Sequence, residues 1–449
     1  MRRIKIVREM TSFQIITLGF FIVILGGSLL LMLPSATRAP GSASFMDSLF
    51  TATSAVCVTG LVVHDTATYW TPFGQSVILL LIQIGGMGVI TIACFLAMLA
   101  GRRIGLFQRN TMQEAIAAPS VGGIVRLTGF ILKMSLTVEV VGASLMAPVF
   151  IKEFGLSKGL WYAVFHSISA FCNAGFDLMG TREKYSSLTA YTDSPVINLT
   201  IAGLIIFGGL GFLTWDDMKR HGYHFRKYRM QSKVIFLMTA GLILFPMLFF
   251  WLVEFSSPVW QDMGTGEKLL ASFFQAVTPR TAGFNSVDLT RFSEPGILLM
   301  IILMLTGGSP GSTAGGMKTT TVAVLILSAL SVFRRNEDTN CFGRRLDVTV
   351  VKQAAAILFM YLFLFLTGGM VISTLEGLPI LSCLFETASA IGTVGLSLGV
   401  TPELGSGSRM ILILLMYFGR VGGLTLVFAA VRSRKKAPLR LPLDKIAVG

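Results

Sequence analysis

The chain has 449 residues, of which 53% are hydrophobic and only 13% are charged. Soluble domains carry about 25% charged residues, so this composition excludes an ordinary water-soluble protein and indicates a surface that largely faces lipid. The formal net charge is +14. A nucleic-acid partner is not expected, because binding one would need basic residues interleaved with stacking aromatics on a folded face.

Apolar runs follow one another along the chain, and runs of about 20 residues are long enough to cross a bilayer as helices. The first run follows Arg2-Arg3-Ile4-Lys5 and is longer than the apolar core of a signal peptide, which has about 7–15 residues. We therefore predict a membrane helix that is not cleaved off. The runs are 12–33, 76–100, 236–253, the shorter 295–306, 353–375 and 410–430.

Basic residues concentrate at both ends of the chain and in alternate connecting segments. The termini and segments 101–126, 216–233 and 334–352 hold 25 Lys/Arg and 8 Asp/Glu, whereas the segments assigned to the other side hold 9 and 14. Lys and Arg are enriched in cytoplasmic loops. The pattern therefore predicts a multi-pass protein of the cytoplasmic membrane with both termini in the cytoplasm.

A short glycine-containing element recurs four times, with its glycines 115, 108 and 112 residues apart. Each copy follows an aromatic-containing stretch that is too short to span a bilayer and is predicted to form a re-entrant half-helix. A second apolar run with its own glycine cluster follows each copy, and we interpret the clusters 85–88 and 208–211 as sites of close helix packing. The lead-in stretches are Phe45–Phe50, Trp161–Phe165, Leu269–Phe274 and Leu381–Phe385.

The repeated unit predicts the fold. We expect an all-α integral membrane protein of four pseudo-repeats, each a helix, a re-entrant pore helix and a second helix, giving eight spanning helices around a central pore. Irregular backbone at membrane depth is tolerated only where it is buried in protein or lines a watery cavity, and four equivalent segments can line one cavity. The repeats are assigned to residues 1–105, 106–226, 227–342 and 343–449.

The four glycine segments are candidates for a potassium selectivity filter, in which rings of backbone carbonyls replace the hydration shell of the ion. Such a backbone favours residues that can adopt positive φ, which Gly does at little steric cost. We expect one strong ring at the glycines and weaker rings from the two residues before each. The candidate residues are Val58, Thr59, Gly60, Asn173, Ala174, Gly175, Thr281, Ala282, Gly283, Thr393, Val394 and Gly395.

These segments resemble those of the Trk/Ktr/HKT superfamily of potassium transporters, and the chain is most similar to the Ktr-type membrane subunit. The resemblance covers almost the whole chain, which starts directly at the first helix of the first unit as Ktr-type members do. It implies potassium uptake, and Gly60 favours potassium because a Ser at this position accompanies sodium transport in the plant branch. A sodium-coupled or weakly selective K⁺/Na⁺ transporter stays as the alternative.

The resemblance also implies partners. Ktr-type subunits are homodimers in which each protomer has its own pore, and they work with a cytosolic ring of nucleotide-binding subunits. This chain has no dinucleotide-binding fingerprint of its own. The basic linkers 101–120, 216–233 and 333–350 and the tail 432–449 are candidate docking sites for such a ring, with contact to anionic membrane lipids as the alternative.

A glycine-rich run follows the short apolar run 295–306 and interrupts the sixth of the eight predicted spanning helices. It should not remain helical, because it contains a proline and five glycines. The resemblance implies that it is an intramembrane gating loop, and a structural kink is the alternative. A phosphate loop is not favoured, because Met317 separates Gly316 from Lys318. The candidate gate residues are Gly307, Gly308, Ser309, Pro310, Gly311, Ser312, Thr313, Ala314, Gly315, Gly316 and Lys318.

Arg420 lies within the last apolar run, where a charge is costly and suggests a function. The resemblance implies that this arginine lies beneath the filter and contacts the gating loop. Acidic residues between the runs are expected either to concentrate cations at the outer mouth or to be ordinary solvated charges: Asp65, Asp177, Asp288 and Glu403.

Other classes of function are not favoured. The four histidines form no HExxH metal site, and no arrangement of catalytic residues is apparent, so we do not expect an enzyme. An alternating-access carrier is favoured by inverted repeats, whereas units that cross the membrane twice run parallel around an axis. The expected ligand is the transported K⁺, with Na⁺ as the alternative ion, and no organic cofactor is expected.

Overall fold

The computed structural model describes residues 10–38, 41–99, 104–116, 122–430 and 442. The basic start at residues 1–9, parts of the 101–120 linker and nearly all of the 432–449 tail lie outside the described residues. Their predicted cytoplasmic docking roles are therefore not addressed by the structure.

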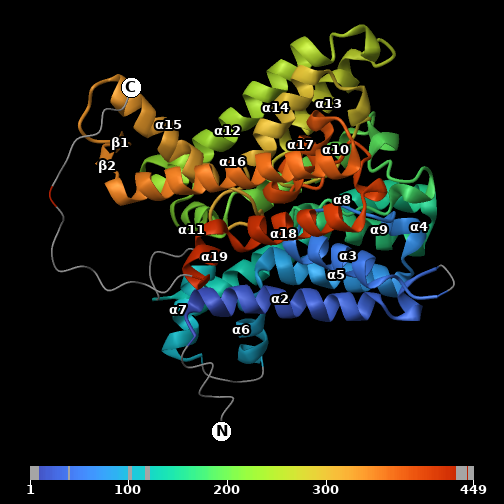
Figure 1. The fold of residues 1–449 in the computed structure, drawn as a ribbon, viewed down its shortest axis with the longest axis horizontal. Helices are drawn as coiled ribbons and strands as arrows, with labels where there is room; N and C mark the ends of the chain where they lie inside the picture. Colours follow the sequence, from blue (N-terminus) through green and yellow to red (C-terminus); the bar gives the residue numbers. More distant parts are fainter. Residues whose placement is uncertain (1–9, 39–40, 100–103, 117–121, 431–441, 443–449) are drawn as a thin grey trace.

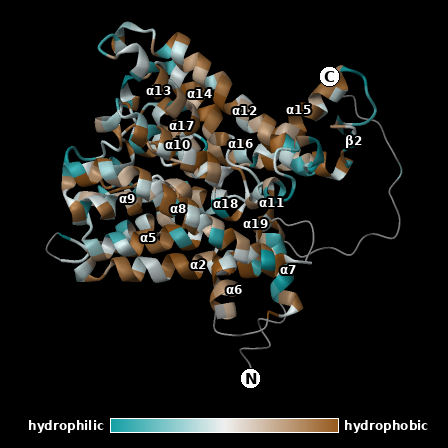
Figure 2. Cartoon of the chain, turned by 180° about the vertical axis from the view of Figure 1, so that it is seen from behind, coloured by the Kyte–Doolittle hydropathy of each residue, from teal (hydrophilic) through white to brown (hydrophobic). Residues whose placement is uncertain are grey.

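Four helices in the described part of the chain are long and apolar enough to cross a membrane by themselves. Between 28% and 33% of each apolar window is buried inside the protein, so most of their side chains face outwards. Figure 2 shows apolar residues along these helices and hydrophilic residues gathered towards the two ends of the bundle. They are α2 (Ser12–Leu31), α8 (Ile124–Phe154), α12 (Met230–Phe249) extended by a π-helical turn to Glu254, and α16 (Val348–Glu376).

Each long helix is followed by a shorter helix whose C-terminal half is buried. In Figure 1, α2 and α16 run along the longest axis, and the shorter helices lie within the same bundle. The first of them, α3, starts at the N-cap Ser44, whose hydroxyl accepts a hydrogen bond from Asp47 N. The shorter helices are α3 (Phe45–Cys57), α9 (Leu156–Phe171), α13 (Thr265–Val277) and α17 (Ile380–Gly392).

Three of the second apolar runs are bent almost at right angles, which corrects the expectation of continuous helices over 76–100 and 410–430. The bends are 95°, 93° and 94°, and they occur at Gly88, Gly211 and Gly422, with φ of 88°, 90° and 91°. Side chains disfavour this backbone conformation, so glycine is needed there. The bent pairs are α5 (Pro72–Met87) with α6 (Val89–Leu99), α10 (Pro195–Gly209) with α11 (Phe212–His221), and α18 (Ser406–Val421) with α19 (Gly423–Ala430).

The sixth predicted spanning helix is interrupted by residues 306–318, which we call the inner loop. Helix α14 (Glu294–Leu305) precedes it and α15 (Thr319–Phe333) follows it. The loop is held as a hairpin-like excursion, because Gly307 N donates to Met317 O at 2.8 Å and Thr319 N donates to Gly308 O at 3.0 Å. The chain therefore leaves the helix and returns close to the point of departure.

The remaining elements are small. α4 (Thr66–Tyr69) follows the first glycine segment, and α7 (Leu106–Ile116) packs against α2 and α6. A two-stranded antiparallel hairpin of β1 (Asn340–Cys341) and β2 (Arg344–Arg345) lies between α15 and α16. These elements connect the larger helices without entering the centre of the bundle, apart from the C-terminal end of α7, described below.

Candidate functional site

The glycine segments 58–60, 173–175, 281–283 and 393–395 share one backbone conformation. In each, the first residue and the glycine have positive φ and the middle residue does not. The first residues are Val58, Asn173, Thr281 and Thr393, with φ of 56°, 58°, 67° and 51°, and the glycines have φ of 94°, 70°, 79° and 95°. Positive φ is an outlier for a β-branched residue and costs about 1–3 kcal/mol, so the surrounding structure must hold it.

The short helices hold the segments through their hydroxyl side chains and last carbonyls. Gly60 N donates to Ser54 Oγ at 3.0 Å, and Gly395 N donates to Ser389 Oγ at 2.9 Å. The middle residues also turn their N–H groups towards the helix, as Thr59 N does to Ser54 O at 2.8 Å. The N–H group of the middle residue in each segment is therefore hydrogen-bonded to the end of the short helix that precedes the segment.

The carbonyls of the middle residues have no such partners. Within the described part of the chain, no hydrogen-bond donor reaches the carbonyl oxygens of Thr59, Ala174, Ala282 and Val394, although these residues are buried. Buried backbone carbonyls are normally paired, and leaving one without a partner costs free energy. We refer to these four oxygens as the carbonyl ring.

The four segments meet in chain order around one point. A Cβ added to Gly60 would lie 2.5 Å from Ala174 O and 3.1 Å from Gly175 Cα. The same relation links each glycine to the next segment and the last glycine to the first: Gly175 to Ala282 O at 2.7 Å, Gly283 to Val394 O, and Gly395 to Thr59 O. Each glycine therefore sits against the carbonyl of its neighbour, and the segments close into a ring.

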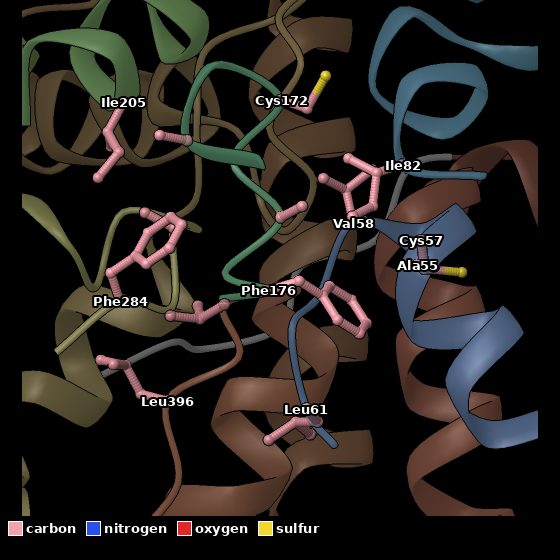
Figure 3. Close-up of a cluster of buried hydrophobic side chains, with 14 of the residues drawn as sticks. Ala55, Cys57, Val58, Leu61, Ile82, Cys172, Phe176, Ile205, Phe284 and Leu396 are labelled. Atoms are coloured by element: carbon pink, nitrogen blue, oxygen red, sulfur yellow. The ribbon is translucent and has the colours of Figure 1, made fainter. Parts of the chain in front are cut away.

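Figure 3 shows the surroundings of this ring. The apolar residue after each glycine comes from a separately coloured segment, and each is at most 1% exposed: Leu61, Phe176, Phe284 and Leu396. The C-terminal ends of the short helices lead into the ring, and a helix C-terminus carries partial negative charge that favours cations. The arrangement provides oxygen ligands and a negative potential, both suited to an alkali cation.

A cavity of about 370 Å³ lies on one side of the ring and is lined by all four glycines. The four acidic residues singled out in the sequence all line it: Asp65, Asp177, Asp288 and Glu403. Burial, with a smaller contribution from the nearby Asp65, raises the pKa of the Asp177 carboxyl, in the loop between α9 and α10, to about 7, although the hydrogen bond from Met179 N lowers it. Asp65 accepts hydrogen bonds from Thr68 N at 2.9 Å and Tyr185 N at 3.1 Å.

The inner loop lies on the other side of the ring and is bonded to the second and fourth quarters of the chain. Ser309 N and Thr313 N donate to Gly209 O and Gly208 O at 3.1 and 3.2 Å, and Gly316 N donates to Gly419 O at 3.1 Å. A Cβ added to Gly316 would lie 2.7 Å from Gly392 O, at the end of α17. The predicted gate residues are therefore gathered directly against the glycine segments.

Arg420 reaches into this region from α18. Its guanidinium donates to Thr313 O in the inner loop, to Gly85 O, and to Gly86 O at 3.1 Å. Lys318 lies at the end of the loop, and its Nζ donates to Ala314 O at 2.8 Å and Gly315 O at 3.4 Å. The two cations therefore bind carbonyls of the loop and of α5, and both line a cavity of about 250 Å³.

The glycines of the cluster 208–211 have two different roles: one allows the close helix packing that was predicted, and another forms a turn that was not predicted. Gly208 lies against Phe171 O at the end of α9, which fits close packing, whereas Gly211 turns the chain. Gly311, in the inner loop, lies against the end of α7, because a Cβ there would be 2.6 Å from Ile116 O. The two glycine types are alike in sequence, and only their three-dimensional neighbours separate them.

Sequence reasoning did not predict that the charged side chain next to the third glycine segment is buried. Arg280, next to the third glycine segment, is 4% exposed and its only side-chain hydrogen bond among the described residues is from Nη2 to Thr239 Oγ1, at 3.3 Å. Its Nε has no partner there. The charge count had placed this arginine with the solvated residues of the outer side, although its position within a glycine segment was a signal of burial.

The comparisons with known proteins agree with this geometry. Residues 3–437 match the family model described as TrkH, cation transport protein. The chain is 39% identical to the potassium/sodium uptake protein NtpJ of Enterococcus hirae, over 99% of both chains. It is also 39% identical to the Ktr system potassium uptake protein B of Bacillus subtilis, over 97% of this chain and 96% of the relative.

A solved structure shares the fold. The potassium transporter TrkH from Vibrio parahaemolyticus superposes with a TM-score of 0.73 and 21% identity, covering 93% of this chain and 84% of that one. The apolar helices and the full-length matches together make this an integral membrane protein. The chain therefore belongs to the TrkH family of cation transport proteins.

Proposed function

We propose that this protein takes up potassium ions through a pore whose selectivity filter is the carbonyl ring with its glycines. The observation that carries the proposal is the set of four equivalent buried carbonyls without a hydrogen-bond partner in the described chain. Such oxygens can replace the water around a bare cation. The tight contact between neighbouring segments explains why each quarter has glycine there.

The four quarters of the chain would form four pseudo-repeats with eight crossings around this pore. The four long helices, the three bent pairs and the α14–α15 pair separated by the inner loop supply these crossings. The excess of Lys and Arg in the basic segments supports a cytoplasmic position for both termini and for the inner-loop side. The acid-lined cavity then faces outwards and would raise the local concentration of cations.

The inner loop would be the gate, because it lies between the carbonyl ring and the cytoplasmic side. Its bonds to Gly208, Gly209 and Gly419 hold a non-helical segment where ions must pass. Arg420 stabilises this closed position and adds a positive charge that repels cations. Regulation by a cytosolic nucleotide-binding ring, and assembly as a homodimer, are part of the proposal through the resemblance to Ktr-type subunits.

A weakly selective K⁺/Na⁺ transporter is the second candidate. The relative in Enterococcus hirae is named a potassium/sodium uptake protein, and the filter motif of this chain ends after one glycine in each quarter. Few well-formed rings give less discrimination than a long filter. In neither case does the proposal include a covalent reaction.

The first test is rescue of growth at low potassium in a bacterial strain that lacks its own uptake systems. Uptake of ⁸⁶Rb⁺ and ²²Na⁺ into proteoliposomes then separates the two candidates. Gly→Ser substitutions at residues 60, 175, 283 and 395 should lower the Rb⁺/Na⁺ ratio, because each side chain would displace a neighbouring carbonyl. An unchanged ratio in all four variants contradicts the filter assignment.

A further inference from the structure

We propose that Asn173 is a positioning residue that transmits the state of the inner loop to the selectivity filter. The inference rests on the proposed function and deepens it. Asn173 belongs to the second glycine segment and is fully buried. Its side-chain amide lies between the third glycine segment on one side and the inner loop on the other.

The amide orientation follows from its partners. Nδ2 lies 3.3 Å from Arg280 O and 3.3 Å from Thr281 Oγ1. A backbone carbonyl only accepts hydrogen bonds, so the nitrogen must face the third segment. The oxygen Oδ1 then faces Thr313 Oγ1 of the inner loop, at 3.3 Å.

Thr313 joins the inner loop to its surroundings through every polar atom that it has. Its N–H donates to Gly208 O at 3.2 Å, and its hydroxyl shares one proton between Asn173 Oδ1 and Phe171 O, which is 3.0 Å away. Its carbonyl accepts from Arg420. Thr313 therefore cannot move with the loop unless its bond to Asn173 breaks.

Gly208 makes the contact possible. A Cβ at this position would lie 2.7 Å from Asn173 Oδ1 and 2.8 Å from Thr313 Oγ1. A methyl group there would separate the two side chains. The close approach of α10 thus keeps the amide and the hydroxyl in contact.

The equivalent residues in the other quarters lack this link. Val58 has no polar side-chain atom, and the Thr393 hydroxyl has no hydrogen-bond partner among the described residues. Asn173 differs from both in carrying a donor and an acceptor at the same branch point. When the loop leaves, Asn173 loses a bond that fixes the amide, and the tie between the second and third segments loosens.

The inference predicts that ion preference depends on the position of the gate. The experiment measures ⁸⁶Rb⁺ and ²²Na⁺ uptake by the full chain in proteoliposomes for Thr313→Val, Asn173→Gly and the double variant. Glycine accepts the positive φ of residue 173, so Asn173→Gly removes only the side chain. Loss of one hydrogen bond should change the Rb⁺/Na⁺ ratio by about two- to ten-fold.

The coupling is tested by non-additivity. The double variant should change the ratio by less than the product of the two single changes, because the bond between Asn173 and Thr313 is removed by both and is lost only once. Thr313→Ser keeps the hydroxyl and should restore the wild-type ratio. Ser312→Ala is the matched control, since Ser312 Oγ bonds only within the loop, to Ser309 O at 2.7 Å, and should leave the ratio unchanged even if total uptake changes.

Several results would overturn the inference. If Thr313→Val and Asn173→Gly both keep the wild-type Rb⁺/Na⁺ ratio, whatever the total uptake, Thr313 acts on the gate and not on the filter. If the changes in the ratio caused by the two single variants add up in the double variant, the two residues act independently. If Thr313→Val does not fold, Thr313→Ala removes the same hydroxyl with a smaller side chain and should shift the ratio in the same direction. A wild-type chain that carries neither ion refutes the proposed function itself, which is a different result from an unaltered ratio.

Discussion

Arg420 on α18 donates a hydrogen bond to the carbonyl oxygen of Thr313, in a loop that begins more than a hundred residues earlier in the chain. The same guanidinium also donates to Gly85 O and Gly86 O of α5. A single cation thus ties the first and fourth quarters to the loop that belongs to the third. Burial of the charge is compensated by carbonyls, since no carboxylate pairs with Arg420 among the described residues.

Replacing this arginine should open the gate. In Arg420→Ala the loop loses a charge-assisted hydrogen bond, worth about 1.5–3 kcal/mol, so the basal ⁸⁶Rb⁺ flux into proteoliposomes should rise about ten-fold or more. The control is Arg409→Ala, on the same helix. The Arg409 guanidinium donates to Asp47 at 2.8 Å and does not contact the inner loop among the described residues. Wild-type flux in Arg420→Ala at equal expression would show that the loop does not depend on this cation.

The glycine at a helix bend should be irreplaceable for conformational reasons alone. Gly88 has a φ of 88°, and a Cβ there would meet only Thr91 Oγ1, at 3.6 Å. In Gly88→Ala the added methyl group therefore has room, but alanine disfavours the backbone conformation at this position. We expect a loss of about 1–2 kcal/mol of stability, measured as a lower midpoint of thermal unfolding in detergent.

A matched glycine separates backbone strain from a general effect of the substitution. Gly26 lies within α2 and has nothing within 4 Å of the added Cβ, so Gly26→Ala should raise stability slightly, by about 0.4–1 kcal/mol. Equal midpoints for Gly88→Ala and Gly26→Ala would contradict the role of positive φ at the bend.

Uptake should depend on external pH through Asp177. Burial raises the pKa of this carboxyl from 3.8 to about 7, so the carboxyl is neutral at pH 6 and becomes charged as pH rises through 7. The added negative charge at the outer cavity, which Asp65, Asp288 and Glu403 also line, should increase ⁸⁶Rb⁺ uptake between pH 6 and 8. The folded state keeps this proton, whereas the unfolded state releases it above about pH 4, so stability falls as the pH rises from about 4 to 7.

The neutral variant Asp177→Asn should remove most of this pH dependence. Asp262→Asn, at an exposed carboxyl outside the cavity, is the control and should keep the wild-type profile. A profile for Asp177→Asn that still rises through pH 7 would assign the titration to another group.

The buried Arg280 should oppose ion binding in the neighbouring segment. Its guanidinium has no carboxylate partner in the described chain and bonds only to Thr239 through Nη2. Arg280→Met removes a positive charge in a low-dielectric region, so the ⁸⁶Rb⁺ concentration for half-maximal uptake should fall several-fold. Replacing a poorly compensated buried charge by an apolar side chain is often neutral or stabilising, so the variant should fold. An unchanged concentration dependence would mean that this charge is screened from the ion.

The positions of the glycine segments could be predicted from the sequence because spacing and chemistry agree there. Four glycines at nearly equal intervals, each after a short aromatic-containing stretch, place a buried turn in every quarter, and α3, α9, α13 and α17 contain those stretches. The inner loop was equally readable, since a run with Pro310 and five glycines cannot continue a helix.

The remaining features depend on contacts that no local pattern encodes. Val58 and Thr393 adopt positive φ against their own preference, because Ser54 and Ser389 hold the glycine that follows. Gly88 and Gly211, where the chain turns, belong to clusters that we interpret from the sequence alone as packing glycines. The bond between Asn173 and Thr313 joins residues 140 positions apart, and only the folded chain brings them together.

The closed circle of glycines bears on how such a chain can change over time. The glycine of each quarter lies against the backbone carbonyl of the next quarter. A side chain added at one glycine would therefore disturb the backbone of two quarters. The quarters are free to diverge in their helices and connections, as they have in the bends and the inner loop. At the circle itself they must remain alike, because a change at any one glycine reaches the carbonyl of the neighbouring quarter.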